Sequence, residues 1–189
     1  MARWQPNASE RLVVAALDLF EERGYEDTTV IEIAERAGLT KSTFFRHFPD
    51  KREVLFGGGT MDGLVVDGIA AAPAEAGPLE AVAHALDFIG REAFPLDRRE
   101  FSARRSAVIA ASPELREREA LKGIRLTALI IDALERRGVP ALTSRVAAEL
   151  GALAWQIAFE RWRDPANDDE FGELTRRALS EVQAASALC

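Results

Sequence analysis

Hydrophobic positions recur every three to four residues along nearly the whole chain, and alternating strand-like patterns are absent. This spacing places apolar side chains on one face of a helix. The first such segment runs from about Ala8 to Arg23, and Gly24 suits its C-terminal cap. The pattern therefore predicts an all-α fold of about nine helices.

Short polar residues set the next boundaries. Thr29 and Glu32 fit a capping box, which predicts a short second helix that ends at Gly38. Thr40 caps a third helix, and this helix stops before Pro49 because proline disfavours a helical residue ahead of it.

The fourth segment combines a helix start with glycines. Asp50 can cap a helix that begins at Lys51, but Gly57–Gly59 follow closely. Each glycine inside a helix costs roughly 1 kcal/mol relative to alanine, so we expect a kink or an interruption there. This segment is either a mobile relay between two domains or a passive spacer.

Prolines, glycines and polar turns separate the later helical segments. They predict an N-terminal domain over residues 1–55 and a C-terminal domain over residues 56–189. The later helices are expected at about Leu79–Phe94, Arg98–Ala111, Pro113–Arg137, Thr143–Arg163 and Asp168–Ala187.

Composition removes several classes of protein. No run of 18 apolar residues suggests a membrane span, and the N-terminus lacks an apolar signal-peptide core. One cysteine, Cys189, and two histidines, His47 and His84, disfavour disulfides, metal sites and a histidine-based triad. We expect a cytoplasmic protein that has no cofactor, does not bind membranes and is not an enzyme.

Charge is distributed unevenly. The formal net charge is -7, yet residues 41–53 carry four basic and two acidic side chains. Nucleic-acid binding responds to such a local basic patch and not to the total charge.

The third predicted helix has two distinct faces. On a helical wheel Phe44 and Phe48 share one side and should pack inward, while Ser42 and Arg46 lie about opposite. Thr43 and Phe45 flank the exposed side. Hydroxyl, guanidinium and aromatic groups suit phosphates and base edges, so the pattern favours a helix-turn-helix. The alternative is an ordinary three-helix domain with a solvated basic face.

The stretch TTVIEIAERAGLTKSTFFRHFPDKREVL, residues Thr28 to Leu55, carries a specific family pattern. It resembles the DNA-binding domain of the TetR family of bacterial transcriptional regulators, over roughly residues 9 to 56. The resemblance implies that the C-terminal domain, residues 56–189, serves ligand binding and dimerisation. The resemblance implies DNA contacts, chiefly to phosphates, from Thr43, Phe45, His47 and Lys51. Phe45 replaces the usual tyrosine and lacks its hydroxyl.

Other positions of the motif complete the predicted interface. By the same resemblance, Lys41 and Arg46 match variable positions that tune the choice of bases. We add Ser42 on the exposed face and the two capping residues Thr29 and Thr40.

Two later stretches resemble a subgroup of this family. RRSAVIAASPELREREALKG, from Arg104, and AFERWRDPANDDEFGELTRRAL, from Ala158, are similar to regulators of the mycofactocin type with an acyl-CoA-like ligand-binding domain. This resemblance implies an acyl-CoA-like effector, and the alternative is another hydrophobic small molecule.

Apolar residues of the C-terminal half supply candidates for a ligand pocket and a dimer interface. Trp155, Phe159 and Trp162 share one helical face, which is either a cavity lining or plain core. Arg104 and Arg105 either meet an anionic head group or form surface ion pairs. The pocket candidates are Met61, Phe88, Phe101, Arg105, Trp155, Phe159 and Trp162, with Phe94 as a similar residue. The interface candidates are Leu150, Leu153, Ile157, Leu174, Ala178 and Val182.

These patterns together predict a ligand-responsive DNA-binding regulator. We expect a repressor that binds a palindromic double-stranded operator as a homodimer and is released by a small hydrophobic or acyl-CoA-like effector. A helical interaction module without DNA binding is the alternative.

Overall fold

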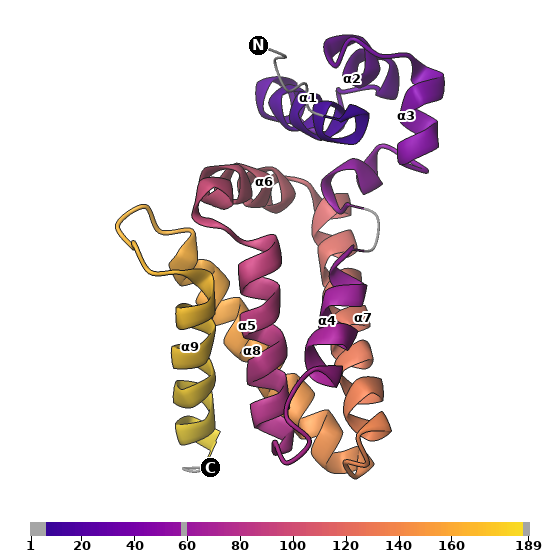
Figure 1. Ribbon diagram of the computed structural model, residues 1–189. Helices are drawn as coiled ribbons and strands as arrows, with labels where there is room; N and C mark the ends of the chain where they lie inside the picture. The colour runs from indigo at the N-terminus through magenta and orange to yellow at the C-terminus, as the bar shows by residue number, and fades with distance from the viewer. Residues whose placement is uncertain (1–6, 58–59, 187–189) are drawn as a thin grey trace, which may run out of the picture. The chain divides into compact units, whose positions relative to one another are not determined.

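The computed structural model describes residues 7–57 and 60–186 and is helical in both stretches, with no strand in either (Figure 1). This confirms the predicted all-α class. The described α-helices are α1 (Ala8–Arg23), α2 (Val30–Arg36), α3 (Lys41–His47), α4 (Thr60–Ala70), α5 (Pro78–Ala93), α6 (Arg99–Ala111), α7 (Pro113–Arg136), α8 (Ala141–Trp162) and α9 (Phe171–Ser186). Two 3-10 helices are η1 (Arg52–Leu55) and η2 (Leu96–Arg98).

The first three helices begin where the sequence predicted, and α1 and α3 also end there, whereas α2 ends at Arg36, two residues before Gly38. Gly24 has φ +90°, which favours glycine, and its N–H donates to the Phe20 carbonyl at 2.9 Å. Thr29 and Glu32 form the predicted capping box of α2. Thr40 caps α3, which ends at His47, two residues before Pro49.

The segment after Pro49 differs from the prediction. Asp50 accepts a hydrogen bond from the Glu53 N–H at 2.9 Å, but the element that it caps is the four-residue η1 and not an α-helix. The expected interruption is confirmed, because α4 begins only at Thr60. Gly57 has φ +56°, whereas Gly58 and Gly59 lie outside the described residues.

The chain divides into two compact units. The N-terminal unit contains the residues up to 59 together with residues 103–120, and the C-terminal unit contains 60–102 and 121–189. Residues 103–120 thus join the N-terminal unit, although they follow the predicted boundary at residue 55. Both α6 and α7 contribute residues to both units.

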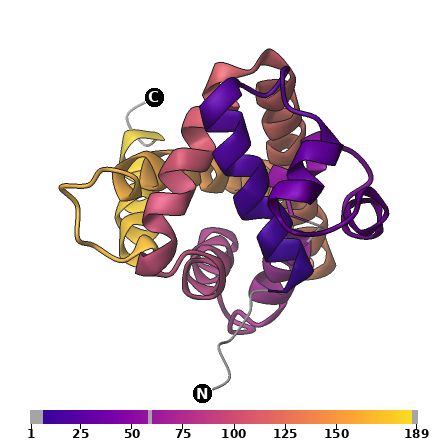
Figure 2. The same cartoon turned by 90° about the horizontal axis from the view of Figure 1, so that it is seen from above.

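Apolar side chains of α1, α2 and α3 form the centre of the N-terminal unit. Leu12, Leu17, Ile33 and Phe44 are fully buried there. Viewed from above, α1 lies across this unit with α2 and α3 on one side and α6 on the other (Figure 2). The core therefore fixes one face of α3 and leaves the opposite face to solvent.

Close helix contacts hold the C-terminal unit together. A Cβ atom added to Gly68 of α4 would lie 2.8 Å from the Ala85 Cα of α5, and one added to Gly151 of α8 would lie 2.5 Å from Val82. Glycine is needed at these positions because the helices approach so closely. In the described part of the chain, none of the helices has the length and apolar character that crossing a membrane requires.

Candidate nucleic-acid interface and ligand site

The two faces of α3 differ as the helical wheel predicted. One face packs into the core and the other is exposed to solvent. Phe44 and Phe48 are buried, while Phe45 is 48% exposed and meets the Phe44 ring edge-on at 5.5 Å. Ser42, Arg46 and His47 are also exposed. Among the residues that the structure describes, no hydrogen bond or ion pair holds these last three side chains. They are available to a partner.

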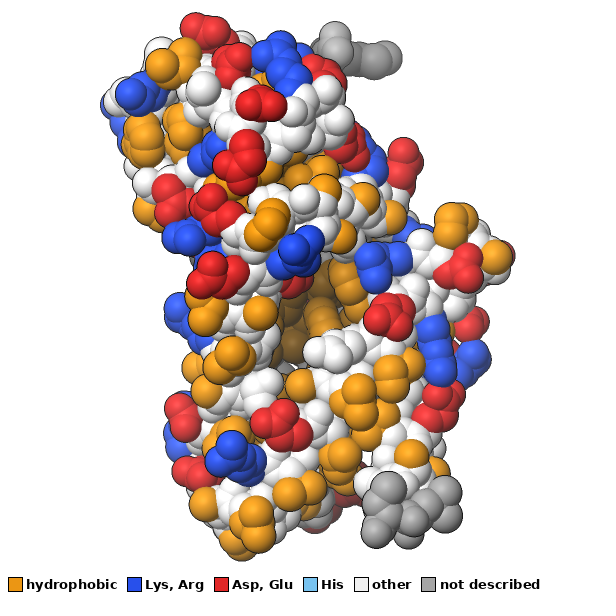
Figure 3. All heavy atoms as spheres, turned by 180° about the vertical axis from the view of Figure 1, so that it is seen from behind, with side chains coloured by type: hydrophobic (Ala, Val, Ile, Leu, Met, Phe, Trp, Pro, Cys, Tyr) orange, Lys and Arg blue, Asp and Glu red, His pale blue; other side chains and the backbone are white. Residues whose placement is uncertain are grey.

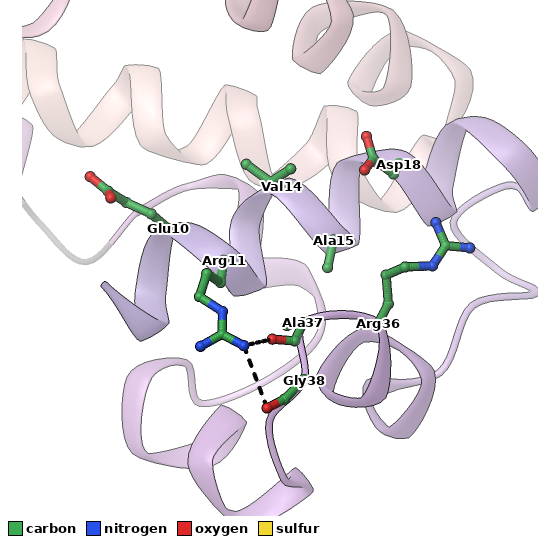
Figure 4. Close-up of a pocket in the computed structure, with 8 residues that line it drawn as sticks. All are labelled: Glu10, Arg11, Val14, Ala15, Asp18, Arg36, Ala37 and Gly38. Carbon is green, nitrogen blue, oxygen red and sulfur yellow. Dashed lines mark hydrogen bonds between the residues drawn. The ribbon is translucent and has the colours of Figure 1, made fainter. Parts of the chain in front are cut away.

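Arg11 of α1 holds the turn between α2 and α3. Gly38 in this turn has φ +66°, and the Arg11 guanidinium donates to the Ala37 carbonyl and lies 3.5 Å from the Gly38 carbonyl oxygen (Figure 4). A groove of about 450 Å³ lies beside this contact and is lined by α1, α2 and the turn. The groove contains no α3 residue, so we assign it no part in DNA contact. Sequence reasoning missed Arg11, because 26 positions separate it from Ala37.

Hydroxyl groups organise the helix starts next to the exposed face. The Thr43 N–H donates to the Thr40 hydroxyl at 3.2 Å, and the two hydroxyl oxygens lie 3.0 Å apart. At α2 the Glu32 carboxylate accepts from the Thr29 hydroxyl and backbone N–H, each at 2.8 Å. These bonds, first from the hydroxyl and then from the N–H, lower the pKa of Glu32. Thr29, Thr40 and Thr43 thus have structural partners in addition to their predicted DNA contacts.

Lys51 is a predicted phosphate contact whose charged group the protein itself holds. Its ammonium group donates to the Tyr25 carbonyl at 2.6 Å and lies 4.0 Å from the centre of the Tyr25 ring. Lys41, by contrast, is exposed and lies 6.0 Å from the Phe45 ring centre.

Arginines of residues 103–120 connect this segment to α1 and η1. Arg104 pairs with Asp18 and Glu21 of α1, and Arg118 forms a two-pronged pair with Glu53 of η1. Arg105 donates to the Leu55 carbonyl at 2.6 Å and pairs with Glu119 at 3.1 Å. From the sequence, a head-group site and surface ion pairs were equally open for Arg104 and Arg105, and the structure shows ion pairs.

Five aromatic rings gather in the C-terminal unit. Phe94 is at their centre, and its ring lies 4.7–5.8 Å from each of the other four. Those four rings belong to Trp155, Phe159, Trp162 and Phe171. Phe171 was not predicted, because it starts α9 after an acidic loop and no periodic pattern precedes it.

One polar atom in this cluster lacks a partner. Trp162 is fully buried, and its indole N–H has no hydrogen-bond acceptor among the described residues. The Arg99 guanidinium lies 5.7 Å from the Trp162 ring and donates to the Asn167 and Asp169 carbonyls. An unpaired buried donor is costly, so this N–H is a feature that a ligand acceptor would satisfy.

The predicted pocket residues are only partly brought together. Trp155, Phe159 and Trp162 belong to the aromatic cluster, and Met61 packs on a neighbouring core that Trp155 also contacts. Phe88 and Phe101 are half-buried, and neither belongs to the described ring contacts. Arg105 belongs to the N-terminal unit, so its assignment to this pocket needs correction: its guanidinium is occupied by Leu55 and Glu119.

The predicted dimer residues divide in the same way. Leu174, Ala178 and Val182 of α9 are buried against α8 within the chain itself, so they cannot form a surface for a second subunit. Helix periodicity identified their apolar face correctly, but α8 of the same chain covers it. Leu153 is 46% exposed, and Leu150 and Ile157 are half-buried.

The described residues contain no group of three or more histidine, cysteine, aspartate or glutamate side chains arranged to hold a metal ion.

Comparison with known proteins identifies the N-terminal segment. Residues 12–57 match the sequence profile described as "Bacterial regulatory proteins, tetR family". The chain is 40% identical over 77 residues to the HTH-type transcriptional regulator TcmR of Streptomyces glaucescens, a match that covers 40% of this chain and 34% of TcmR. The chain thus spans about a third of this relative. Its relatives are named as transcriptional regulators and not as enzymes, as expected.

Solved structures extend the similarity to almost the whole chain. NalD, the secondary repressor of the MexAB-OprM multidrug efflux pump in Pseudomonas aeruginosa, matches with a TM-score of 0.60 at 19% identity, over 94% of this chain and 95% of NalD. Thermus thermophilus FadR, a TetR family repressor solved with lauroyl-CoA, matches with a TM-score of 0.52 at 22% identity, over 93% of each chain. Such identities show a common fold. Residues 12–57 are thus similar to the tetR family of bacterial regulatory proteins, and the chain has the fold of these solved regulators.

Proposed function

We propose that this protein is a transcriptional regulator, a repressor, that binds a palindromic double-stranded operator as a homodimer and releases it when a small hydrophobic effector binds. The observation that carries the proposal is the exposed face of α3. Phe44 and Phe48 anchor this helix in the core, whereas Ser42, Arg46 and His47 face solvent without partners among the described residues.

The chemistry of this face fits a DNA major groove. Arginine forms paired hydrogen bonds with guanine, and small hydroxyl side chains allow a helix to approach the base edges. Lys41 and Lys51 supply positive charge for phosphates, and His47 supplies a ring N–H donor. Such phosphate contacts set position and affinity more than sequence choice. The exposed Phe45 ring offers an apolar contact to a thymine methyl group or a sugar.

An apolar stripe on α8 supports a dimer. Leu142, Val146 and Leu153 are 75%, 51% and 46% exposed, and Leu150 and Ile157 continue the same helical face. Exposed apolar patches of this kind mark protein interfaces. In a two-fold dimer the same patch meets its own copy. Each subunit would then present one α3, and the half-sites would lie about 34–36 Å apart or a multiple of this spacing.

The aromatic cluster supports a hydrophobic effector. Figure 3 shows hydrophobic side chains at many places on one face of the molecule, and a hollow in that face. Phe94, Trp155 and Phe159 are only partly buried, and the Trp162 N–H could satisfy an acceptor of the ligand. FadR was solved with lauroyl-CoA, so we include acyl-CoA thioesters among the effectors to test. Arg105 is engaged elsewhere, so a head group would need other cations.

A gel-shift titration with the DNA upstream of the protein's own gene tests the proposal. We expect a discrete complex that unlabelled specific fragment displaces and unlabelled random DNA does not. Arg46→Ala should reduce this preference. Arg145→Ala, at an exposed arginine of α8, is the charge-matched control and should retain it.

Light scattering should give a dimer, and Leu142→Glu should shift it to monomer. Lauroyl-CoA and an uncharged hydrophobic ligand, added separately, test release.

The outcomes separate the alternatives. A dimer that binds no duplex would favour a helical interaction module, and a monomer with and without DNA would reject the dimer. DNA binding that no hydrophobic compound alters would leave the regulator intact and refute the proposed effector class.

A further inference from the structure

The position of Lys51 is unusual for a lysine assigned to phosphate contact. Long lysine side chains usually move freely on a surface, but the Lys51 ammonium is fixed by the Tyr25 carbonyl at 2.6 Å. It also lies 3.5 Å from the Glu26 carbonyl and 4.0 Å from the centre of the Tyr25 ring. An ammonium group has three N–H donors. Two carbonyls therefore leave one donor for a phosphate oxygen.

Tyr25 is held in turn by its surroundings. It is 6% exposed, and its ring meets Phe20 edge-on at 5.3 Å. Its hydroxyl donates to a carboxylate oxygen of Glu114 at 2.8 Å. Burial, and then the hydrogen bond to Glu114, raise the pKa of the phenol, so Tyr25 remains a neutral donor. The ring under Lys51 thus has one polar attachment, and that attachment is on α7.

Glu114 lies in the first turn of α7, between two residues that fix this turn. Pro113 is the first residue of the helix, and Leu115 is fully buried. Glu114, Tyr25 and Lys51 all belong to the N-terminal unit, although 89 positions separate Tyr25 from Glu114. Later residues of α7 belong to the C-terminal unit.

We propose that Glu114 is a positioning residue for DNA binding, which acts through the Tyr25 hydroxyl to keep the Lys51 ammonium in place for a phosphate. The inference deepens the proposed function and rests on it for the role of Lys51. The first turn of α7 then controls one DNA contact, although this turn does not touch DNA itself.

The physical basis is preorganisation. A long side chain that is ordered before binding does not lose that freedom when the complex forms. A cation on the face of an aromatic ring is attracted by the ring electrons, but only while the ring keeps its orientation. Loss of the hydrogen bond to Glu114 lets the Tyr25 ring move. The Lys51 ammonium is then no longer held on the face of that ring.

A DNA-free measurement tests the positioning directly. Side-chain NMR of the full chain, with lysine labelled, reports the order parameters of Lys51 and of the exposed Lys41. In the wild type Lys51 should be the more ordered. Tyr25→Phe keeps the ring and removes the hydroxyl, and Glu114→Ala removes the acceptor. Each should lower the order of Lys51 toward that of Lys41, with thermal unfolding used to confirm the fold. Unchanged order of Lys51 in both variants would overturn the proposal.

DNA binding provides the second measurement, with a short random-sequence duplex as the probe at several salt concentrations. Tyr25→Phe and Glu114→Ala should each weaken binding by about 2- to 10-fold, the range for ordering one long side chain. The double variant should bind the duplex no more weakly than the more affected of the two single variants. In a Lys51→Ala background, neither change should alter the affinity. Glu117→Ala, an exposed carboxylate on the same helix, is the matched control for charge and should not weaken binding.

The two measurements test different claims, so their results can be told apart. A wild-type protein that binds no duplex refutes the proposed function, and the order parameters then decide the Glu114–Tyr25–Lys51 contact alone. Additive effects, or equal weakening by Glu117→Ala, would show that the weakening does not depend on the Tyr25 contact and would overturn the proposal.

Discussion

The two compact units use their aromatic residues in opposite ways. In the N-terminal unit, Phe44 is buried so that its neighbour Phe45 can be presented to solvent on a short, capped helix. In the C-terminal unit, Phe94 and Phe171 stack at 4.7 Å within a cluster of five rings, and Trp162 is completely buried. Short helices with strong caps suit an external binding surface, whereas an internal aromatic cluster suits an apolar ligand and depends on long-range packing.

The largest expected effect follows from removing the fully buried ring of the aromatic cluster. Trp162→Ala deletes a fully buried ring and should lower the free energy of unfolding by about 3–5 kcal/mol, because the cavity cannot collapse completely. Phe45→Ala, at a ring that is 48% exposed, should change it by no more than about 0.5 kcal/mol. Urea unfolding followed by circular dichroism checks both. Similar losses of unfolding free energy at the two sites would contradict the difference between the two units.

Helix packing in the C-terminal unit gives a matched glycine pair on α4. Gly68→Ala places a Cβ 2.8 Å from the Ala85 Cα, so a helix must shift, and we expect a loss of about 1–3 kcal/mol. At Gly63 nothing lies within 4 Å, and Gly63→Ala should raise stability by up to about 1 kcal/mol through helix propensity. Urea midpoints that move in the same direction would contradict the close α4–α5 contact.

Two basic residues of the N-terminal unit should make different kinds of contact with DNA. Arg46→Ala should cost about 1–3 kcal/mol at one base pair of the operator if the guanidinium reads guanine. Lys51→Ala should weaken all sequences about equally and reduce the salt dependence by the equivalent of about one phosphate contact. Anisotropy titrations on operator and random duplexes across salt concentrations measure both quantities. Identical profiles for the two variants would refute the separation of roles.

The smallest expected effect concerns the cap of α2. Hydrogen bonds from Thr29 lower the pKa of Glu32 in the folded protein, so Glu32 contributes stability above its unfolded pKa of about 4.3 and loses it as the pH falls through the folded value. Glu32→Gln should therefore be less stable than wild type at pH 7, and the difference should vanish in acid. Glu35→Gln, on the same helix, is the control. Thermal midpoints measured as a function of pH check this, and a difference that persists in acid would refute the capping contribution.

Local interactions explain why the sequence predicted the first three helices so well. Caps such as Thr29–Glu32 and Thr40–Thr43 join residues three positions apart, and helix periodicity separates Phe44 from Phe45 directly. The family motif covers the same short stretch. These features are complete within a few turns of chain, so the helix bounds and the exposed face of α3 followed from the sequence.

Only tertiary packing decided which apolar faces were covered and where distant polar groups paired. Leu174 and Val182 carry a helical pattern that suits a dimer interface or a core equally, and α8 of the same chain determines that they are core. Arg105 could meet a ligand or a carboxylate, and its partners Leu55 and Glu119 became known only from the fold. The bond from Tyr25 to Glu114 spans 89 positions. Periodicity records the face of a helix that is apolar, but contacts between distant segments depend on how the whole chain packs.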